Sequence, residues 1–96
     1  MNASTMASAS QILFYMESQQ SAMVELLKNL VAMETPSDDP ASQQQIRLRL
    51  KQEFERRDYR VNLIPGRDSG GHVYATPAKG RNKMPAQLML GHCDTV

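Results

Sequence analysis

The sequence contains one cysteine, no tryptophan and only 5% aromatic residues among its 96 residues. A single cysteine cannot form a disulfide within the chain, which excludes a disulfide-stabilised secreted scaffold. No apolar run approaches the roughly 18 residues that a membrane span needs. The run Ile12–Met16 is too short for a signal-peptide core, and no basic residue precedes Lys28. With a formal net charge of +1, the chain has no general electrostatic reason to bind nucleic acid. We therefore expect a soluble, cytoplasmic protein that binds neither membranes nor nucleic acid.

Strong core-forming residues are also scarce. Leucine, valine, isoleucine and phenylalanine together make up 19 of the 96 residues, near the roughly 20% level below which ordered globular structure becomes doubtful. Disorder also requires a large net charge, which this chain lacks. We expect one small domain with a thin core, formed by residues 10–96 after a flexible, Ser/Ala-rich N-terminus at residues 1–9.

Helical periodicity predicts two helices. The first runs from about Ser10 to Met33 and ends there because Pro36 biases Thr35 away from helical angles. It carries one apolar stripe, which consists of Met23, Leu26, Leu27, Leu30 and Val31. The second helix starts at Asp39-Pro40, where the carboxylate can cap free N–H groups. It extends to about Asp58, and its apolar face consists of Ile46, Leu50 and Phe54.

The pattern then changes to that of strands. Residues 59–64 alternate between apolar and polar side chains, and a Gly/Pro/Ser-rich turn separates them from a second strand at residues 72–76. The apolar run Ala86–Leu90 predicts a third strand that is buried on both faces. Two helices ahead of about three strands indicate an α/β fold. Because a doubly buried strand needs further cover, we expect the chain to be an incomplete domain.

A possible chemical site follows the third predicted strand. In extended backbone, His92 and Asp94 point to the same side. An imidazole can give one nitrogen to a metal while a carboxylate accepts the N–H of the other, which fixes the tautomer. The alternative is a surface histidine beside a turn aspartate, and that is the commoner meaning of an isolated His-x-Asp. A zinc site also takes three or four protein ligands.

The residues around this pair resemble a known enzyme family. The segment Leu88-Met89-Leu90-Gly91-His92-Cys93-Asp94-Thr95-Val96 is similar to the first metal motif of the glutamate carboxypeptidase, aminoacylase and succinyl-diaminopimelate desuccinylase family of dizinc peptidases (peptidase family M-twenty). Upstream, Leu26–Val31 and Glu34–Ser37 resemble the opening helix of the family and the loop that follows it. The resemblance extends from about Ser21 to Val96, and it is closest to the glutamate carboxypeptidase branch.

This resemblance implies an N-terminal fragment of an α/β/α zinc-exopeptidase catalytic domain with a mixed sheet. By the same resemblance, His92 is a metal ligand and Asp94 is the catalytic aspartate that orients it. The whole protein would hold two zinc ions, with cobalt or manganese as alternatives. It would hydrolyse the amide bond of an acyl-amino acid or short peptide next to a free carboxylate, and the family also allows a homodimer. The other ligands and the general base have no counterparts here, so we expect the 96-residue chain to be inactive and to bind zinc weakly.

Other residues favour structural roles. For Cys93 we prefer packing as a small hydrophobe to zinc ligation, and we interpret His72 as a turn or surface residue. The locally basic segment from Arg47 to Arg60 fits a solvated helix face with ion pairs such as Glu53–Arg57 better than a phosphate-binding surface. The alternative function is a small non-catalytic binding module that uses this basic helix or an exposed sheet edge.

Overall fold

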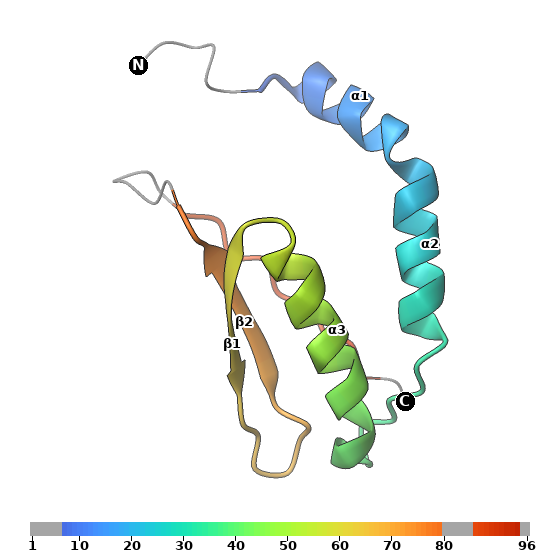
Figure 1. Ribbon diagram of the computed structural model, residues 1–96, viewed down its shortest axis with the longest axis vertical. Coiled ribbons are helices and arrows are strands. Elements are labelled where there is room, and N and C mark those ends of the chain that lie inside the picture. The colour runs from blue at the N-terminus through green and yellow to red at the C-terminus, as the bar shows by residue number, and fades with distance from the viewer. Residues whose placement is uncertain (1–6, 80–85, 95–96) are drawn as a thin grey trace. The chain divides into compact units, whose positions relative to one another are not determined.

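The computed structural model describes residues 7–79 and 86–94 of the chain, which divides into two compact units, Met1–Ala32 and Met33–Val96 (Figure 1). The described residues form three α-helices, one short 3-10 helix and a two-stranded sheet, so the mixed α/β class is confirmed. None of the helices in these ranges has the length and hydrophobicity that crossing a membrane requires. Most of the expected flexible N-terminus, and residues 80–85, lie outside the described residues.

The first unit contains two helices where the sequence predicted one. Helix α1 (Ala9–Ser18) begins with a capping box in which Ser8 and Gln11 satisfy each other's backbone N–H groups. Helix α2 (Gln20–Val31) follows after a single non-helical residue, Gln19. The Ser18 hydroxyl donates to the Tyr15 carbonyl at 2.6 Å, the kind of side-chain bond that bends helices. The Gln19 N–H still donates to Tyr15 at 3.2 Å, so the hydrogen-bond ladder continues through the bend.

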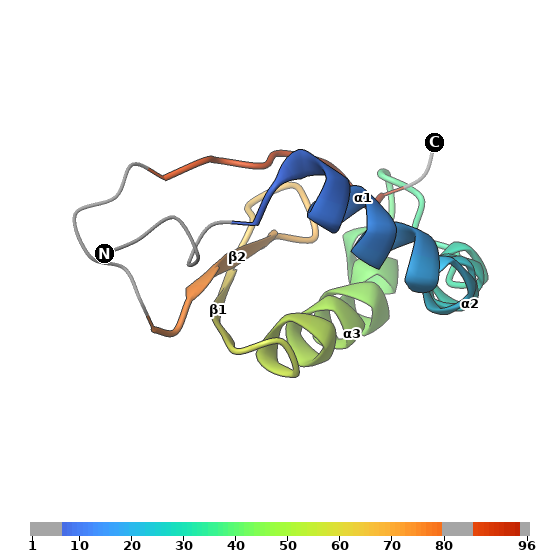
Figure 2. The same ribbon diagram turned by 90° about the horizontal axis from the view of Figure 1, so that it is seen from above.

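The second unit is a helix packed on a β-hairpin. Strands β1 (Tyr59–Ile64) and β2 (His72–Pro77) pair antiparallel, with Val61 opposite Ala75 and Leu63 opposite Val73. These four side chains are half-buried on the same face of the hairpin. Helix α3 (Gln44–Glu55) lies along the hairpin (Figures 1 and 2). The two strands agree with the sequence prediction, apart from one additional residue at the end of β2.

The start and end of the second predicted helix differ from expectation. Its first turn is a separate 3-10 helix, η2 (Pro40–Gln43), and α3 ends at Glu55 rather than near Asp58. Asp58 has a φ of 64°, a left-handed conformation that turns the chain into β1. The Asp39 carboxylate makes no capping hydrogen bond. Instead the Asp39 carbonyl accepts from the N–H and the hydroxyl of Ser42, so the predicted side-chain cap was wrong.

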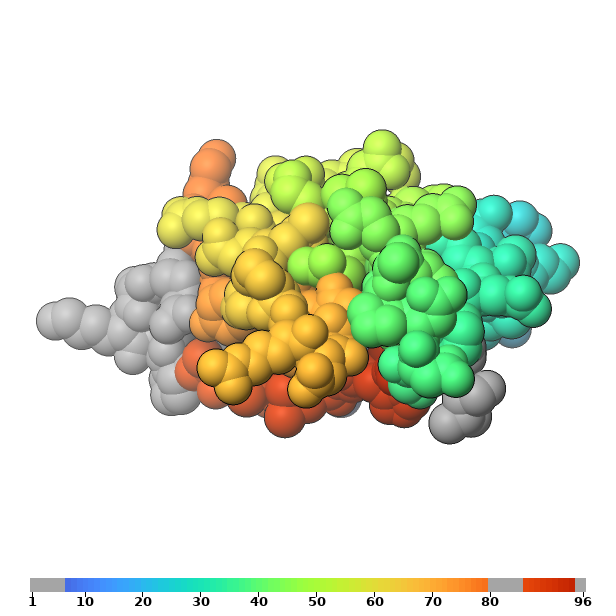
Figure 3. Space-filling model, turned by 90° about the horizontal axis from the view of Figure 1, so that it is seen from below, coloured from blue at the N-terminus to red at the C-terminus, as the bar shows by residue number. Residues whose placement is uncertain are grey.

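The predicted third strand does not form. Residues 86–90 have no regular secondary structure, and Leu88, Met89 and Leu90 are 74%, 87% and 86% exposed. Figure 3 shows this segment, in red, at the surface of the second unit. A strand with apolar side chains on both sides needs a neighbouring strand and cover on both faces. Residues 86–90 do not pair with the hairpin. The sheet of the described residues therefore consists of the antiparallel strands β1 and β2 alone.

The core of the second unit is as thin as the composition predicted. Ile46 is 3% exposed, and it is the one apolar side chain of the described residues that is buried. At the other end of α3, the rings of Phe54 and Tyr59 meet edge to face with their centroids 5.5 Å apart. The stability of this unit therefore depends on a few contacts between α3 and the hairpin.

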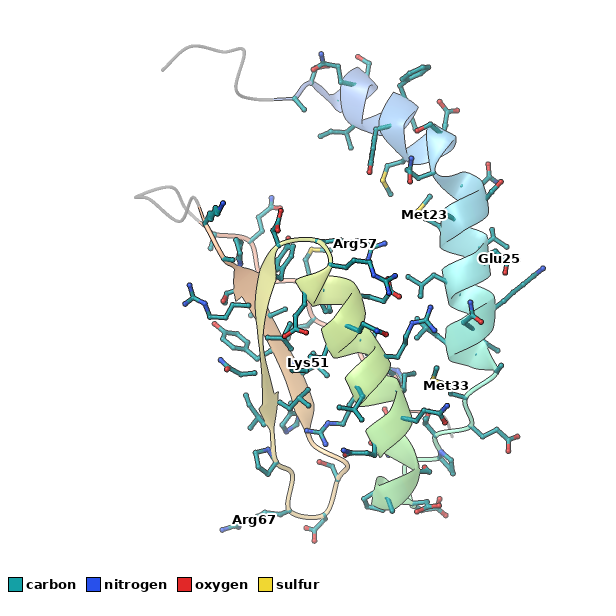
Figure 4. All side chains as sticks on the ribbon, viewed as in Figure 1. Met23, Glu25, Met33, Lys51, Arg57 and Arg67 are labelled. Atoms are coloured by element: carbon teal, nitrogen blue, oxygen red, sulfur yellow. The ribbon has the colours of Figure 1, made fainter. Side chains whose placement is uncertain are left out.

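Polar contacts on α3 centre on Glu53, whose side chain is only 9% exposed. Its carboxylate accepts hydrogen bonds from Arg49 and Arg57, both at 2.9 Å, and Arg56 lies at 3.2 Å. In Figure 4 the labelled Lys51 lies on this helix and Arg57 in the turn that follows it. The hydrogen bonds from Arg57 and then Arg49 lower the pKa of Glu53. The ion pairs predicted along this helix, including Glu53–Arg57, are thus confirmed.

This cluster predicts an acid-sensitive contribution to stability. Because the folded-state pKa of Glu53 lies below its unfolded value, the contribution is complete above the unfolded pKa and is lost as pH falls through the folded one. Since Arg56 and Arg57 are more than half exposed, we expect Glu53→Gln to cost about 1 kcal/mol at neutral pH. Urea unfolding at several pH values should show this difference shrinking in acid. The control Glu55→Gln, which removes an exposed pair with Lys51, should cost at most about 0.5 kcal/mol. Equal losses for both variants would contradict the prediction.

Candidate functional site

The side chains of His92 and Asp94 lie together, as their spacing predicted. His92 Nδ1 is 3.1 Å from Asp94 Oδ1 and 3.3 Å from the Asp94 carbonyl oxygen. The His92 side chain is 85% exposed, whereas that of Asp94 is 33% exposed. The carboxylate therefore contacts one ring nitrogen, while most of the imidazole faces solvent.

This geometry decides which nitrogen carries the proton. Both neighbours of Nδ1 are oxygens that accept hydrogen bonds when Asp94 is ionised, so Nδ1 must be the donor. The Asp94 carboxylate is ionised at neutral pH, and hydrogen bonds from His92 and then from Ser37 lower its pKa further. Neutral His92 therefore presents the lone pair of Nε2, the form in which an imidazole binds a metal.

The backbone of the site is attached to the loop that follows α2. Thr35 is fully buried, and its hydroxyl donates to the carbonyl of Cys93 at 3.0 Å across 58 positions of sequence. Together with the contact from Ser37, this bond joins the loop to the His92–Asp94 segment. No pattern in the sequence predicts this role of the Thr35 hydroxyl. The available signal was Pro36, which biases the preceding Thr35 towards extended backbone.

The loop is in turn held by Gln43 at the end of η2. The Gln43 amide donates to the Pro36 carbonyl at 3.2 Å, and the residue is 6% exposed. Gly70 in the hairpin turn packs directly on the Gln43 side chain, since a Cβ at position 70 would lie 2.3 Å from Gln43 Oε1. The site therefore depends on the second unit as a whole, because the loop, η2 and the hairpin turn are in mutual contact.

Arg47 and Cys93 complete the surroundings of the site. Arg47 lies on α3 and donates to the Ile64 carbonyl at 3.4 Å, and its guanidinium packs against Gly71. Gly71 has a φ of 97°, which disfavours any other residue there. Burial and the charge of Asp94 raise the pKa of the Cys93 thiol, and the charge of Arg47 only partly opposes this. A neutral thiol is a poor metal ligand, which agrees with the prediction that Cys93 packs as a small hydrophobe.

His92 and Asp94 do not form a complete metal site with the residues around them. Within residues 7–79 and 86–94, no group of three or more His, Cys, Asp or Glu side chains could hold a metal ion. His72, the first residue of β2, is exposed and pairs with Ile64, as expected for a surface residue. The described residues thus provide one imidazole with its orienting carboxylate. Gly91 makes no close approach, since a Cβ there would meet nothing within 4 Å, and residues 95–96 of the motif lie outside the description.

Removal of the Thr35 hydroxyl should release the His92–Asp94 segment from the loop. Thr35→Val keeps the shape of the side chain but leaves the Cys93 carbonyl without its partner, and we expect a loss of about 1–2 kcal/mol. Amide exchange of residues 92–94 should then be faster, whereas Thr35→Ser, which retains the donor, should stay close to the unsubstituted chain. Hydrogen exchange followed by NMR would measure this. Equal protection in the valine and serine variants would contradict the role given to the hydroxyl.

Comparison with known proteins identifies no family for this chain. No protein-family model matches the chain, and no curated protein or solved structure is significantly similar to it.

Proposed function

We propose that this chain is the N-terminal part of a zinc-dependent metallohydrolase that cleaves the amide bond of acyl-amino acids or short peptides next to a free carboxylate. The proposal includes membership of the glutamate carboxypeptidase, aminoacylase and succinyl-diaminopimelate desuccinylase family. The observation that supports it most is the contact of 3.1 Å between His92 Nδ1 and Asp94 Oδ1, which leaves Nε2 on an imidazole that is 85% exposed. A carboxylate that orients a metal-binding histidine in this way is typical of metal sites in proteins.

In this proposal each residue of the site has a specific task. His92 provides Nε2 as one metal ligand, and Asp94 holds the Nδ1 proton and fixes the direction of the ring. The Ser37 side chain and the buried hydroxyl of Thr35 hold Asp94 and its backbone in position. Bound zinc would polarise the scissile carbonyl and activate a water molecule. The remaining ligands and the general base would come from residues after those seen here, so the 96-residue chain should have no hydrolase activity.

The exposed run Leu88–Leu90 fits the same proposal. Three large apolar side chains in a row, each at least 74% exposed, are costly to leave in water, at roughly 1.5–3 kcal/mol per side chain. As a strand within a larger α/β/α domain with a mixed sheet, this run would be paired and covered on both faces. His92 would then follow the carboxyl end of a buried strand, where open α/β sheets place their ligands.

The size and the activity of the native product test this proposal. An immunoblot of the source cells with antibodies against residues 1–96 should detect a species several times heavier than 10.8 kDa. The purified heavier species should release amino acids from acyl-amino acids, should lose that activity with a chelator, and should regain it with zinc, cobalt or manganese. A single species of 10.8 kDa, or a heavier species that is inactive with all three metals, would refute the proposal. Either outcome would instead favour a non-catalytic binding module.

A zinc titration of the isolated chain gives an independent check. One imidazole cannot hold a metal ion against water, because structural and catalytic zinc sites need at least three protein ligands. Calorimetry on residues 1–96 should therefore detect binding weaker than micromolar. A stoichiometric site of submicromolar affinity would show that the chain completes a metal site with its own residues.

A further inference from the structure

Gln43 is one of the few polar residues that are buried in the described part of the chain. It is the last residue of η2 and is 6% exposed. Its side-chain amide donates to the carbonyl of Pro36, seven positions earlier, at 3.2 Å. Burial of an amide costs free energy unless its hydrogen bonds are kept, so this contact strongly favours one position of the side chain. The amide therefore connects η2 to the loop that precedes it.

The hairpin turn also holds the Gln43 side chain. Gly70 lies so close that a Cβ at position 70 would be 2.3 Å from Gln43 Oε1 and 2.7 Å from Gln43 Cβ. In Figure 4 the labelled Arg67 marks this turn, which lies beside the beginning of the second helical segment. Any larger residue at position 70 would force the turn or the Gln43 side chain to move. Gln43 thus contacts both the turn and the loop.

Pro36 lies between the two residues that hold the candidate site. The Thr35 hydroxyl donates to the Cys93 carbonyl at 3.0 Å, and the Ser37 side chain donates to Asp94. A displacement of Pro36 would therefore move both of these contacts.

The carbonyl of Pro36 is the group that fixes its position. Since proline has no N–H, the carbonyl is the only backbone group through which a hydrogen bond can hold this residue. It accepts from the Asp39 N–H at 3.0 Å and from the Gln43 amide, and a carbonyl with two lone pairs can take both bonds. Gln43 thus supplies one of the two bonds that hold the middle of the loop.

The ring of His92 depends on the carboxylate that the loop holds. The His92 side chain is 85% exposed, and Nδ1 lies 3.1 Å from Asp94 Oδ1. A ring with so little packing around it follows its carboxylate. Even a small displacement of Asp94 should therefore change the direction of Nε2 and weaken the selection of the tautomer with its proton on Nδ1.

We propose that Gln43 is a positioning residue of the candidate metal site. By holding the Pro36 carbonyl, it keeps the loop in contact with the Asp94 carboxylate and thereby sets the direction of His92 Nε2. The metal-binding part of this assignment rests on the proposed function. The coupling between Gln43 and the His92 ring requires no metal, so it can be measured separately.

A purely structural role of Gln43 has different consequences. If Gln43 only packs η2 against the hairpin turn, its loss lowers the free energy of unfolding but leaves the His92 ring unchanged in the molecules that stay folded. A positioning role also changes the ratio of the two His92 tautomers in the folded chain. The tautomer ratio therefore separates the two roles.

Nitrogen chemical shifts of the His92 imidazole measure this ratio in the metal-free 96-residue chain, at about pH 8 where the ring is neutral. Gln43→Met keeps the length of the side chain but removes the amide. The ratio of the Nδ1–H to the Nε2–H tautomer should fall by about 3- to 10-fold, the equilibrium effect of one lost hydrogen bond. The matched control Gln44→Met makes the same change at the next, exposed position and should leave the ratio within about twofold. An unchanged ratio in Gln43→Met, or equal changes in both variants, would overturn the proposal.

A double-mutant cycle with Ser37 tests the route of the coupling. Ser37→Ala removes the contact of the loop with Asp94 and should itself lower the ratio. Adding Gln43→Met to Ser37→Ala should then change the ratio much less than Gln43→Met does alone, whereas two effects that multiply would contradict the route through the loop. If Gln43→Met unfolds the second unit, Gln43→Asn, which withdraws the amide from Pro36 by one methylene, should lower the ratio instead.

Zinc affinity of the proposed hydrolase separates this inference from the function on which it rests. Gln43→Met should weaken zinc binding by about 3- to 10-fold, less than the 10- to 100-fold typical of a direct partner of the ligand. A longer protein without zinc-dependent activity, in which the tautomer ratio still responds to Gln43, would refute the proposed function and leave the coupling intact. An active zinc enzyme whose ratio and zinc affinity ignore Gln43 would refute the positioning role alone.

Discussion

In the proposed zinc hydrolase, replacing Asp94 is expected to lower hydrolysis of acyl-amino acids by about 10- to 100-fold, because the partners that orient metal-bound histidines typically contribute this much. Asp94→Asn keeps an oxygen that accepts the proton of His92 Nδ1, but it removes the negative charge. Asp94→Ala removes both, so the alanine variant should show the larger loss. Activity and zinc affinity, measured together on each variant, would separate weaker metal binding from slower chemistry.

The exposed Asp38 provides the control for this series. It lies in the same loop as Ser37, and Asp38→Asn removes one negative charge near the site without touching His92. We expect activity and zinc affinity close to those of the unsubstituted protein. An active zinc enzyme in which Asp94→Ala has no effect would exclude the role of Asp94 while leaving the reaction class intact. Loss of activity in Asp38→Asn equal to that in Asp94→Asn would show that charge alone accounts for the effect.

A tautomer measurement on the isolated chain examines the same contact without any metal. Because Nδ1 of His92 faces two acceptor oxygens, neutral His92 should carry its proton mainly on Nδ1. Nitrogen chemical shifts of the imidazole distinguish the two tautomers. In Asp94→Ala the preference should weaken or reverse, since the partner that selects it has gone.

Local patterns predicted most of the elements of the second unit. Alternation identified β1 and β2 nearly to the residue, and Pro40 marked the start of the second helical segment. Local patterns failed where a competing local bond or a distant partner decides the structure. The first predicted helix is interrupted at Gln19, next to the bond from the Ser18 hydroxyl to the Tyr15 carbonyl, a kind of bond that competes with the helix. The predicted strand at residues 86–90 lacks a neighbour, because strand formation depends on pairing and cover that a single segment cannot provide.

In the candidate site, too, the local pattern predicted one part and distant partners decided the rest. The two-residue spacing was enough to place His92 and Asp94 on the same side, because extended backbone has a period of two. The hydrogen bond from Thr35 to the Cys93 carbonyl and the packing of Arg47 on Gly71 connect positions that are far apart in sequence. No local pattern encodes such contacts. The sequence therefore identified the pair that could bind a metal, and the fold revealed the residues that hold it.

Stability of the second unit should depend on one side chain above all. Ile46 is the buried apolar residue of the described chain, at 3% exposure, and it lies on α3, which packs on both strands. Truncation of a buried isoleucine to alanine costs about 2–5 kcal/mol, and truncation to valine about 0.5–1.5 kcal/mol. A unit of this size rarely gains more than about 3–5 kcal/mol from its core. Ile46→Ala should therefore leave the unit largely unfolded at neutral pH, while Ile46→Val should remain folded but weakened.

Leu48 is the matched control for this prediction, because it lies two residues later on the same helix and is 47% exposed. Leu48→Ala should cost no more than about 1 kcal/mol, since much of its apolar surface already contacts water. Urea unfolding followed by far-ultraviolet circular dichroism, with the amide spectra of β1 and β2 as a second probe, would measure all three variants. Equal destabilisation by Ile46→Ala and Leu48→Ala would mean that the packing of α3 on the hairpin is not what holds this unit together. Because Gln43 on η2 bonds to the loop that holds the site and Arg47 on α3 packs on the hairpin turn, loss of Ile46 should also speed amide exchange at residues 92–94. If those amides stayed protected in Ile46→Ala, the site would be held by the loop alone.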